Sequence, residues 1–313
     1  MRRNTDMAIK LGVSGWAISG VYDPPFEEGL EQLGKLGFQG TELIVSSRNM
    51  MDEYFTEERC DKLRRQLDSY GMEVSEFVVY KDLLVGMSLL DKEKKEEAYR
   101  IFERGAQITK ALGCGIINTV SHWIPGLQAP VPYPPSYVYP NVPGINLFEP
   151  KMVMTYPEFD WDELWDNYVD SVRTVCDIAD QYGLKFALEG HPHVIVSHVD
   201  SFIRLYKEVG RKNLGMNYDT SMQGDQREYQ PISLRKLGKK RLLHMHVRDS
   251  DSVACHQLPI GCGVYDWDGI ITELKKMDFD GYLSLEYAKY ADPIRWLTFS
   301  KRYLEEVIDR IYQ

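Results

Sequence analysis

Long apolar runs, cationic charge and cysteine are all scarce in this chain. No apolar run reaches the roughly 18 residues that a membrane-spanning helix needs, so we expect no membrane partner. The net charge is −10, from 37 Lys and Arg against 47 Asp and Glu, and an acidic face repels phosphate, so we expect no nucleic-acid partner. The first ten residues are charged without an apolar segment behind them, so we expect no signal peptide. These absences favour a cytoplasmic protein that binds a small molecule.

The cysteines are scattered and odd in number. Five are present, which is typical of reduced thiols in an intracellular protein rather than of a disulfide framework. Cys255, His256 and Cys262 lie near one another, but no second ligand pair has the spacing of a structural zinc site. We therefore expect no structural zinc there.

Short apolar segments alternate with longer amphipathic ones. The strand-like segments are 10–17, 40–45, 73–79, 115–120, 185–190, 213–219, 242–247 and 281–287. The helix-like segments are 26–36, 56–70, 92–112, 162–182, 200–209, 269–277 and 294–311, with a poorly periodic stretch before the seventh strand. Strands alternating with helices indicate a parallel sheet. Eight such units predict an α/β fold, a closed (β/α)₈ TIM barrel that forms a single domain over residues 1–313.

An open, doubly wound sheet is the alternative arrangement. Such sheets bind phosphate groups with a glycine-rich turn directly after the first strand. Gly12, Gly15 and Gly20 do not have the spacing of that turn, so we favour the barrel.

A long insertion interrupts the alternation after the fourth strand. Residues 121–160 contain nine of the 15 prolines together with several Trp, Tyr and Phe residues. So many aromatic residues are unusual in a solvated tether, and long loops in compact domains are usually lids or binding loops. We expect this loop to pack over a site, with an arm for oligomerisation or partner binding as the alternative.

Polar residues stand at the predicted strand ends, and TIM barrels carry their active sites at the carboxyl ends of the strands. Strands five to eight end in Glu189, Asp219, His246 and Glu286. Three carboxylates directed at one point would repel one another unless a cation lies between them. We predict that these four residues bind one divalent metal ion, with Mn²⁺ favoured and Mg²⁺, Co²⁺ and Zn²⁺ as alternatives.

The seventh strand carries its histidines at alternate positions, in the segment RLLHMHVRD (241–249). Side chains alternate between the two faces of a strand, so His244, His246 and Arg248 point to the same side. We expect His246 at the mouth as a ligand, His244 one layer deeper in support, and Arg248 facing substrate oxygens.

Five motifs carry a family resemblance. They are LEGH (188–191), NYDT (217–220), HMHVRD (244–249), PIGCGVYDW (259–267) and GYLSLEY (281–287). In this order they resemble the sugar isomerase/epimerase superfamily, with its xylose isomerase-like TIM barrel, its ketose 3-epimerases and its inosose dehydratases. The resemblance implies a metal-dependent isomerase or epimerase of a sugar. Glu189 and Glu286 would flank the substrate carbon and exchange its proton through a metal-stabilised enediolate.

The chain departs from the ketose epimerase pattern at three places. Met222 stands where those enzymes carry a histidine, Ser252 where they carry an arginine, and the apolar segment 194–196 where they carry a second acid. We therefore expect different substrate recognition, with His191 as a further catalytic candidate. The substrate-binding candidates are Trp16, Glu42, His122, Trp123, His193 and Arg248.

Two other functions stay open at this point. A lyase or dehydratase could act on an oxidised sugar, an inositol or a 3-oxo-glycoside, including C- or O-deglycosylation, since the same intermediate can expel a leaving group. A non-catalytic sugar-binding subunit would keep the barrel without the reaction. A DNA-repair role like that of the endonuclease IV branch is disfavoured by the presence of only seven histidines and by the negative charge. The substrate is not readable from the sequence, and both a homo-oligomer and a hetero-complex fit it.

Overall fold

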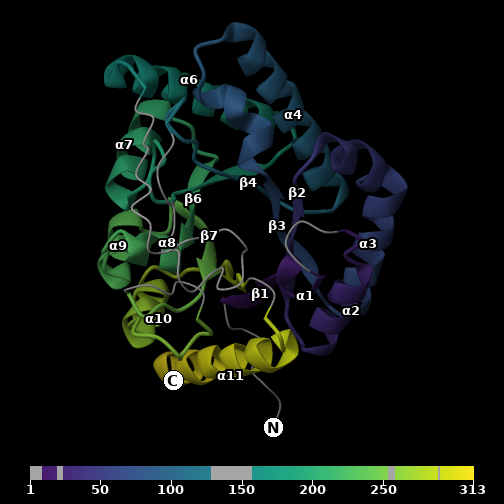
Figure 1. Cartoon of the computed structure of the whole chain (residues 1–313). Helices are drawn as coiled ribbons and strands as arrows, with labels where there is room; N and C mark the ends of the chain where they lie inside the picture. Colours follow the sequence, from purple (N-terminus) through teal and green to yellow (C-terminus); the bar gives the residue numbers. More distant parts are fainter. Residues whose placement is uncertain (1–8, 20–23, 128–156, 253–257, 288–289) are drawn as a thin grey trace, which may run out of the picture.

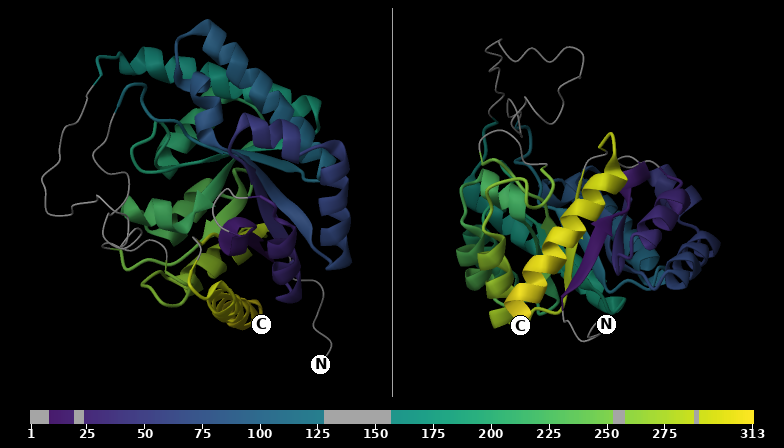
Figure 2. Two further views of the ribbon diagram at one scale, coloured as in Figure 1. Left: turned by 45° about the vertical axis from the view of Figure 1, so that its right-hand side comes forward. Right: turned by 90° about the horizontal axis from the view of Figure 1, so that it is seen from below.

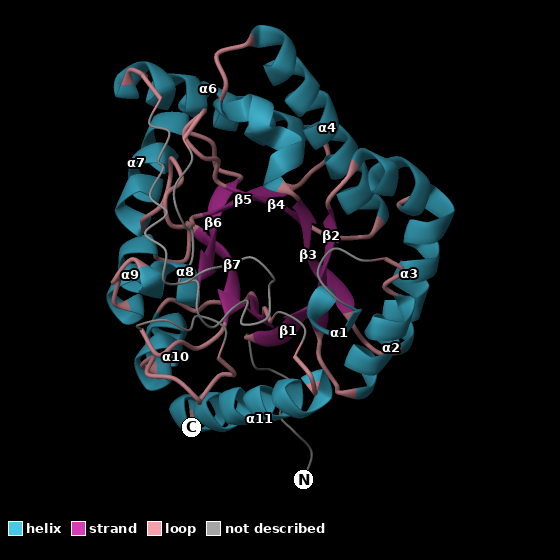
Figure 3. Ribbon diagram, viewed as in Figure 1, coloured by secondary structure: helices cyan, strands magenta, loops and turns pink. Residues whose placement is uncertain are grey.

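Eight parallel strands close into one barrel (Figures 1 and 3). The computed structural model describes residues 9–19, 24–127, 157–252, 258–287 and 290–313. The strands are β1 (Lys10–Ser14), β2 (Gly40–Val45), β3 (Glu73–Val79), β4 (Ile116–Val120), β5 (Lys185–Glu189), β6 (Leu214–Asp219), β7 (Leu242–Val247) and β8 (Tyr282–Leu285). Each pairs with its sequence neighbours, and β8 pairs with β1. The predicted TIM barrel is therefore confirmed.

The helices form a ring outside the strands, as all views show (Figure 2). They are α1 (Trp16–Ser19), α2 (Glu27–Lys35), α3 (Glu57–Ser69), α4 (Lys92–Ala111), α6 (Trp161–Gln181), α7 (Val199–Val209), α8 (Thr220–Asp225), α9 (Gln230–Leu237), α10 (Trp267–Lys276) and α11 (Pro293–Tyr312). A π-helical turn, η1 (Met50–Tyr54), follows β2, and a 3₁₀ segment, η2 (Lys81–Ser88), follows β3.

Side-chain caps and amphipathic faces explain where these helices begin and how they pack. In α6 the Asp160 carboxylate accepts the backbone N–H of Glu163 at 2.9 Å, which satisfies one of the free donors of the first turn. The inward face of α6 buries Trp165, Tyr168 and Val172 against the barrel. The same capping contact opens five more helices, at Thr56, Asp91, Asp219, Asp266 and Asp292.

Two segments differ from the sequence prediction. The first strand was expected over 10–17 but ends at Ser14, and Trp16 begins the short helix α1. Gly15 lies between the strand and the helix. Its N–H donates to the carbonyl of Glu42 at 2.9 Å, and a Cβ there would lie 2.6 Å from that oxygen, so a larger residue would not fit. The poorly periodic stretch forms α8 and α9.

The predicted insertion lies only partly within the described residues. Its flanks, 121–127 and 157–160, are described and follow β4, whereas 128–156 lie outside the described residues, so its lid or partner role stays a prediction. In the part of the chain that is described, no helix is long and apolar enough to cross a membrane. The four cysteines within that part are free thiols, and Cys255 lies outside it together with His256.

Tyr282 fills the amino-terminal end of the barrel because two glycines leave room for it. A Cβ at Gly40 would lie 2.4 Å from its ring, and one at Gly12 would lie 3.3 Å from it. We expect Gly40→Ala to lower the free energy of unfolding by about 1–3 kcal/mol, since overpacking displaces neighbouring side chains. The measurement is denaturant unfolding.

Gly115→Ala is the matched control for this prediction. No heavy atom lies within 4 Å of the Cβ that it would add, and the backbone there is not left-handed. Equal losses in the two variants would contradict the packing explanation.

Candidate metal centre and active site

Four side chains converge at the carboxyl end of the barrel. Glu189 and Asp219 end β5 and β6, His246 is the penultimate residue of β7, and Glu286 follows β8. One ligand atom from each lies within 4.8 Å of all the others. The register pairs Asp219 with His246 directly, so the mouth positions of adjacent strands are level. The structure thus brings together the four predicted ligands, all of which are buried or nearly so.

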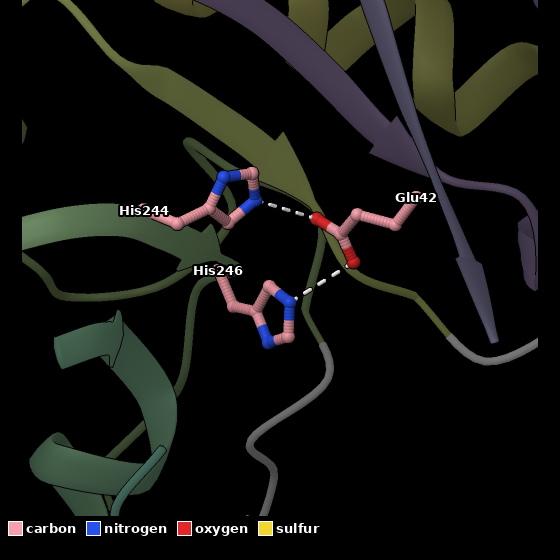
Figure 4. Close-up of side chains that lie close together, drawn as sticks. All are labelled: Glu42, His244 and His246. Atoms are coloured by element: carbon pink, nitrogen blue, oxygen red, sulfur yellow. Dashed lines mark hydrogen bonds and ion pairs between the residues drawn. The ribbon is translucent and has the colours of Figure 1, made fainter. Parts of the chain in front are cut away.

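The two ring nitrogens of His246 face different groups. Nδ1 faces the mouth, where it lies 3.3 Å from Oε2 of Glu189 and 3.3 Å from Oε2 of Glu286. Nε2 faces the barrel interior, where it lies 3.0 Å from Oε2 of Glu42 (Figure 4). Burial opposes a charge on this ring, but the surrounding carboxylates outweigh it and raise the pKa of His246 well above its ordinary value.

Glu42 lies in the barrel interior, beneath the mouth. Its side chain is 0% exposed, and its two oxygens bind two histidines: Oε1 lies 2.8 Å from Nε2 of His244, and Oε2 bonds to His246 (Figure 4). Burial would raise the pKa of Glu42, but the charge and hydrogen bonds of His246 and His244 hold it below its ordinary range. The prediction that His244 lies deeper than His246 fits this arrangement.

Glu76 is a second buried carboxylate that sequence reasoning missed. It pairs with Glu42 in the register of β2 and β3, and its Oε2 lies 3.5 Å from Nε2 of His244. Burial raises the pKa of Glu76 well above its ordinary value. The only sequence signal was a glutamate inside the apolar run EVSEFVV.

Arg248 joins two of the predicted ligands. Its guanidinium donates to Asp219 and lies 2.8 Å from Oε2 of Glu286, although the side chain is almost fully buried. Burial disfavours the charge, yet the carboxylates of Asp219 and Glu286 raise the pKa of Arg248 above its ordinary value. The other oxygen of Asp219 accepts the backbone N–H groups of Ser221 and Met222 at 2.7 and 3.0 Å.

His191, the further catalytic candidate, contacts one of the predicted metal ligands at the barrel mouth. Its Nε2 lies 2.8 Å from Oε1 of Glu189, and this bond orients the carboxylate. Burial raises the pKa of Glu189, but His246 and His191 lower it by more than burial raises it. The pKa of Glu189 therefore lies below its ordinary range. Trp16, at the start of α1 after β1, is also buried.

The predicted substrate residues of the β4 and β5 loops lie together. Trp123 stacks on His193, with ring centroids 6.1 Å apart, and its backbone forms a bridge to Val194. His122 is buried, with Nδ1 3.1 Å from the Tyr168 hydroxyl, and burial lowers the pKa of His122 to about 4. The apolar segment 194–196, where the epimerase pattern has an acid, is buried in the core.

One aspartate ties the end of β7 to the next loop and explains two of the motifs. Asp249 accepts the N–H of Gly261 at 2.9 Å, the indole N–H of Trp267 at 2.9 Å and the N–H of Tyr265 at 3.2 Å. A Cβ at Gly263 would lie 2.1 Å from its Oδ1, so only glycine fits there. HMHVRD and PIGCGVYDW are thus two halves of one structural unit.

Comparison with known proteins identifies the same fold as the structure, a TIM barrel. A model of the family described as "Xylose isomerase-like TIM barrel" matches residues 30–307. An uncharacterized protein of Methanocaldococcus jannaschii is 26% identical over 184 residues, 54% of this chain and 62% of that protein. The inosose isomerase of Bacillus subtilis is 28% identical over 136 residues, 40% of this chain and 48% of that protein. The matches thus span less than two thirds of these curated relatives.

Solved structures share the fold over almost the whole chain. A D-psicose 3-epimerase with D-tagatose, from Clostridium cellulolyticum, has a TM-score of 0.76 at 16% identity and covers 96% of this chain and 99% of its own. The 3-keto-D-glucoside 4-epimerase from E. coli has a TM-score of 0.72 at 16% identity, covering 95% and 99%. The IolI protein with a bound zinc atom has a TM-score of 0.70 at 18% identity, covering 96% and 99%.

Proposed function

This chain belongs to the xylose isomerase-like TIM barrel family, and we propose that it is a divalent-metal-dependent isomerase or epimerase of a sugar. The observation that carries the proposal is the convergence of Glu189, Asp219, His246 and Glu286 within 4.8 Å at the barrel mouth. The names of three relatives support it, because psicose, inosose and 3-keto-glucoside all have a carbonyl beside a carbon that bears hydrogen and hydroxyl.

The donor set fits a divalent cation. Three carboxylates and one imidazole are a largely hard, oxygen-rich set, for which we propose Mn²⁺, with Mg²⁺, Co²⁺ and Zn²⁺ compatible. Three carboxylates meet at this point, and Arg248 bonds to only two of them, Asp219 and Glu286, so the positive charge of a cation is electrostatically favourable there. When bound, it supplies Lewis-acid polarisation of the substrate carbonyl, which acidifies the adjacent C–H.

Glu189 and Glu286 are the proposed proton carriers. Glu189 ends β5 and Glu286 directly follows β8, and each has one oxygen 3.3 Å from Nδ1 of His246. One carboxylate removes the proton next to the carbonyl, and the C–H electron pair moves into the carbonyl to give an enediolate. Return of a proton to the opposite face of the same carbon gives the epimer. Return to the neighbouring carbon, together with transfer of the hydroxyl proton to the other oxygen, gives the isomer.

The remaining mouth residues are proposed to hold the substrate. Arg248 offers N–H donors to its oxygens, and His191 keeps the Glu189 carboxylate in one orientation at 2.8 Å. The stacked Trp123 and His193 present aromatic faces, which suit sugar rings. Trp16 and His122 stay candidates for the same role.

Solvent exchange tests the proposal. Chain loaded with Mn²⁺ in D₂O is expected to place deuterium on the carbon next to the carbonyl of at least one of D-psicose, L-ribulose, an inosose and a 3-keto-glucoside. The readout is proton NMR, and chelator-treated chain is the control. The proposal fails if no member of the panel exchanges.

A lyase is the second candidate. The chain departs from the ketose epimerase pattern at Met222 and Ser252, and the stacked pair of Trp123 and His193 offers an aromatic face that suits an aglycone. The same intermediate expels a leaving group when one stands β to the carbonyl. Release of aglycone from a 3-oxo-glycoside, with no deuterium in any ketose, would replace the isomerase by a deglycosylating lyase.

A further inference from the structure

We propose that Glu42 is a positioning residue that holds Nε2 of His246, so that Nδ1 of the same ring is presented to the metal ion. The inference rests on the proposed metal centre, and it reassigns Glu42 from the substrate to the support of a ligand. The observation behind it is that the two ring nitrogens of His246 face different carboxylates. Nδ1 faces Glu189 at the mouth, and Nε2 faces Glu42 in the interior.

The geometry separates the two nitrogens of His246. Nδ1 faces Glu189 and Glu286 at 3.3 Å each, whereas Nε2 lies 3.0 Å from Oε2 of Glu42 (Figure 4). A neutral imidazole carries one proton, and the nitrogen without it is the one that can bind a metal. A proton held on Nε2 therefore leaves the lone pair of Nδ1 free for the mouth.

Glu42 is itself held in place across the barrel. It comes from β2, and the histidines that it binds come from β7, with β1 and β8 between those strands. His244 takes Oε1 at 2.8 Å, so the carboxylate cannot turn away from His246 without losing a buried hydrogen bond. A buried carboxylate in a fixed orientation is the partner that metal-bound histidines commonly use.

Asn217 is the competing contact of Nε2. Its Nδ2 lies 3.0 Å from Nε2 of His246 and 3.3 Å from Oε2 of Glu189. A bond from an imidazole N–H to an anionic carboxylate is roughly twice as strong as one between neutral groups. We therefore infer that Nε2 of His246 carries the proton and donates it to the Glu42 carboxylate.

A second metal ion between Glu42, His244 and His246 is the rival explanation of the inner group. These three residues offer ligand atoms within 4.8 Å of one another. However, each imidazole N–H points at a separate oxygen of one carboxylate at ordinary hydrogen-bond distance, which satisfies both donors without an ion. The number of Zn²⁺ ions bound per chain decides between a second metal ion and a hydrogen-bonded inner group.

Nitrogen NMR of the wild-type chain tests the tautomer without any variant. In the Zn²⁺-loaded chain labelled with ¹⁵N-histidine, the His246 ring is expected to show a protonated Nε2 and an unprotonated Nδ1. The signal is identified by its loss in His246→Gln. A protonated Nδ1 with a bare Nε2 would overturn the proposal.

Zn²⁺ affinity, measured by competition with a chelator, tests the role of the carboxylate. Glu42→Gln keeps the volume but directs an amide at the histidines, and it is expected to weaken binding by about 10- to 100-fold. Glu76→Gln is the matched control, because Glu76 is an equally buried glutamate at the paired position of β3, with no bond to His246. It is expected to keep the wild-type affinity.

The outcomes separate this inference from the proposed function. A wild-type chain that binds no Zn²⁺ removes the metal centre itself. Tight binding in Glu42→Gln, or equal weakening in both variants, removes only the positioning role. Two Zn²⁺ ions per wild-type chain and one in Glu42→Gln would establish the inner metal site instead. Thermal unfolding of each variant verifies that it is folded.

Discussion

Glu286→Gln is expected to keep its metal ion and to lose about 10³-fold in the rate of deuterium exchange into substrate. Glutamine retains a carbonyl oxygen for the cation and for Arg248, whose guanidinium lies 2.8 Å from Oε2, but it cannot take up a proton. Of the two proposed proton carriers, Glu286 is the more open, with its side chain 19% exposed against 4% for Glu189. The measurement combines NMR exchange rates with elemental analysis of the same sample.

Glu273→Gln is the matched control for that experiment. Glu273 is also a largely buried glutamate, but it lies on α10 and binds Arg235 and Lys276 on the outside of the barrel. We expect it to exchange at the wild-type rate. Wild-type exchange in Glu286→Gln with full metal content would remove Glu286 from the proton path.

Asp219→Asn is expected to abolish the stabilisation of the chain by Mn²⁺. A ligand present at about 100 times its Kd stabilises the folded state by about 2.7 kcal/mol, which corresponds to roughly 4 °C in Tm for a chain of this length. Asparagine has one oxygen, and the N–H groups of Ser221 and Met222 bind it, so α8 stays capped. Its NH2 group then takes the place of the oxygen that faces the metal site, and an amide NH2 cannot bind a cation. The measurement is the Tm difference with and without Mn²⁺.

For each variant, the Tm with Mn²⁺ is compared with the Tm of the same variant without it. This is needed because Asp219→Asn also removes an ion-pair partner of the buried Arg248. Asp160→Asn, the same substitution at the cap of α6 and away from the mouth, should keep the full Mn²⁺ shift. An unchanged shift in Asp219→Asn would exclude Asp219 as a ligand.

The residues at the mouth could be predicted because only local rules were needed. Strand ends meet at one edge of a parallel barrel, and alternation along a strand assigns each side chain to a face, so the convergence of Glu189, Asp219, His246 and Glu286 follows from strand bounds alone. The bounds were good where the apolar runs were sharp, as in β2, β3 and β7.

The interior of the barrel could not be predicted in the same way. Contact between Glu42 and His246 depends on how strands that are not neighbours approach one another across the barrel. Irregularities change that approach, at the register shifts between Thr41 and Glu42 and between Met216 and Asn217. Glu76 had no motif to single it out, and only the packed barrel shows that it lies beside His244.

The hydrogen bonds that Asp249 accepts from the loop after β7 limit how this barrel can be engineered. The loop after β7 cannot be exchanged as a free module, because its backbone at Gly261 and Tyr265 and the indole of Trp267 are all bound to one carboxylate of the preceding strand end. A grafted loop would need to bring its own aspartate, glycine and tryptophan as a set. Arg248, directly before Asp249, would otherwise lose its place at the mouth, so specificity is better redesigned from other loops.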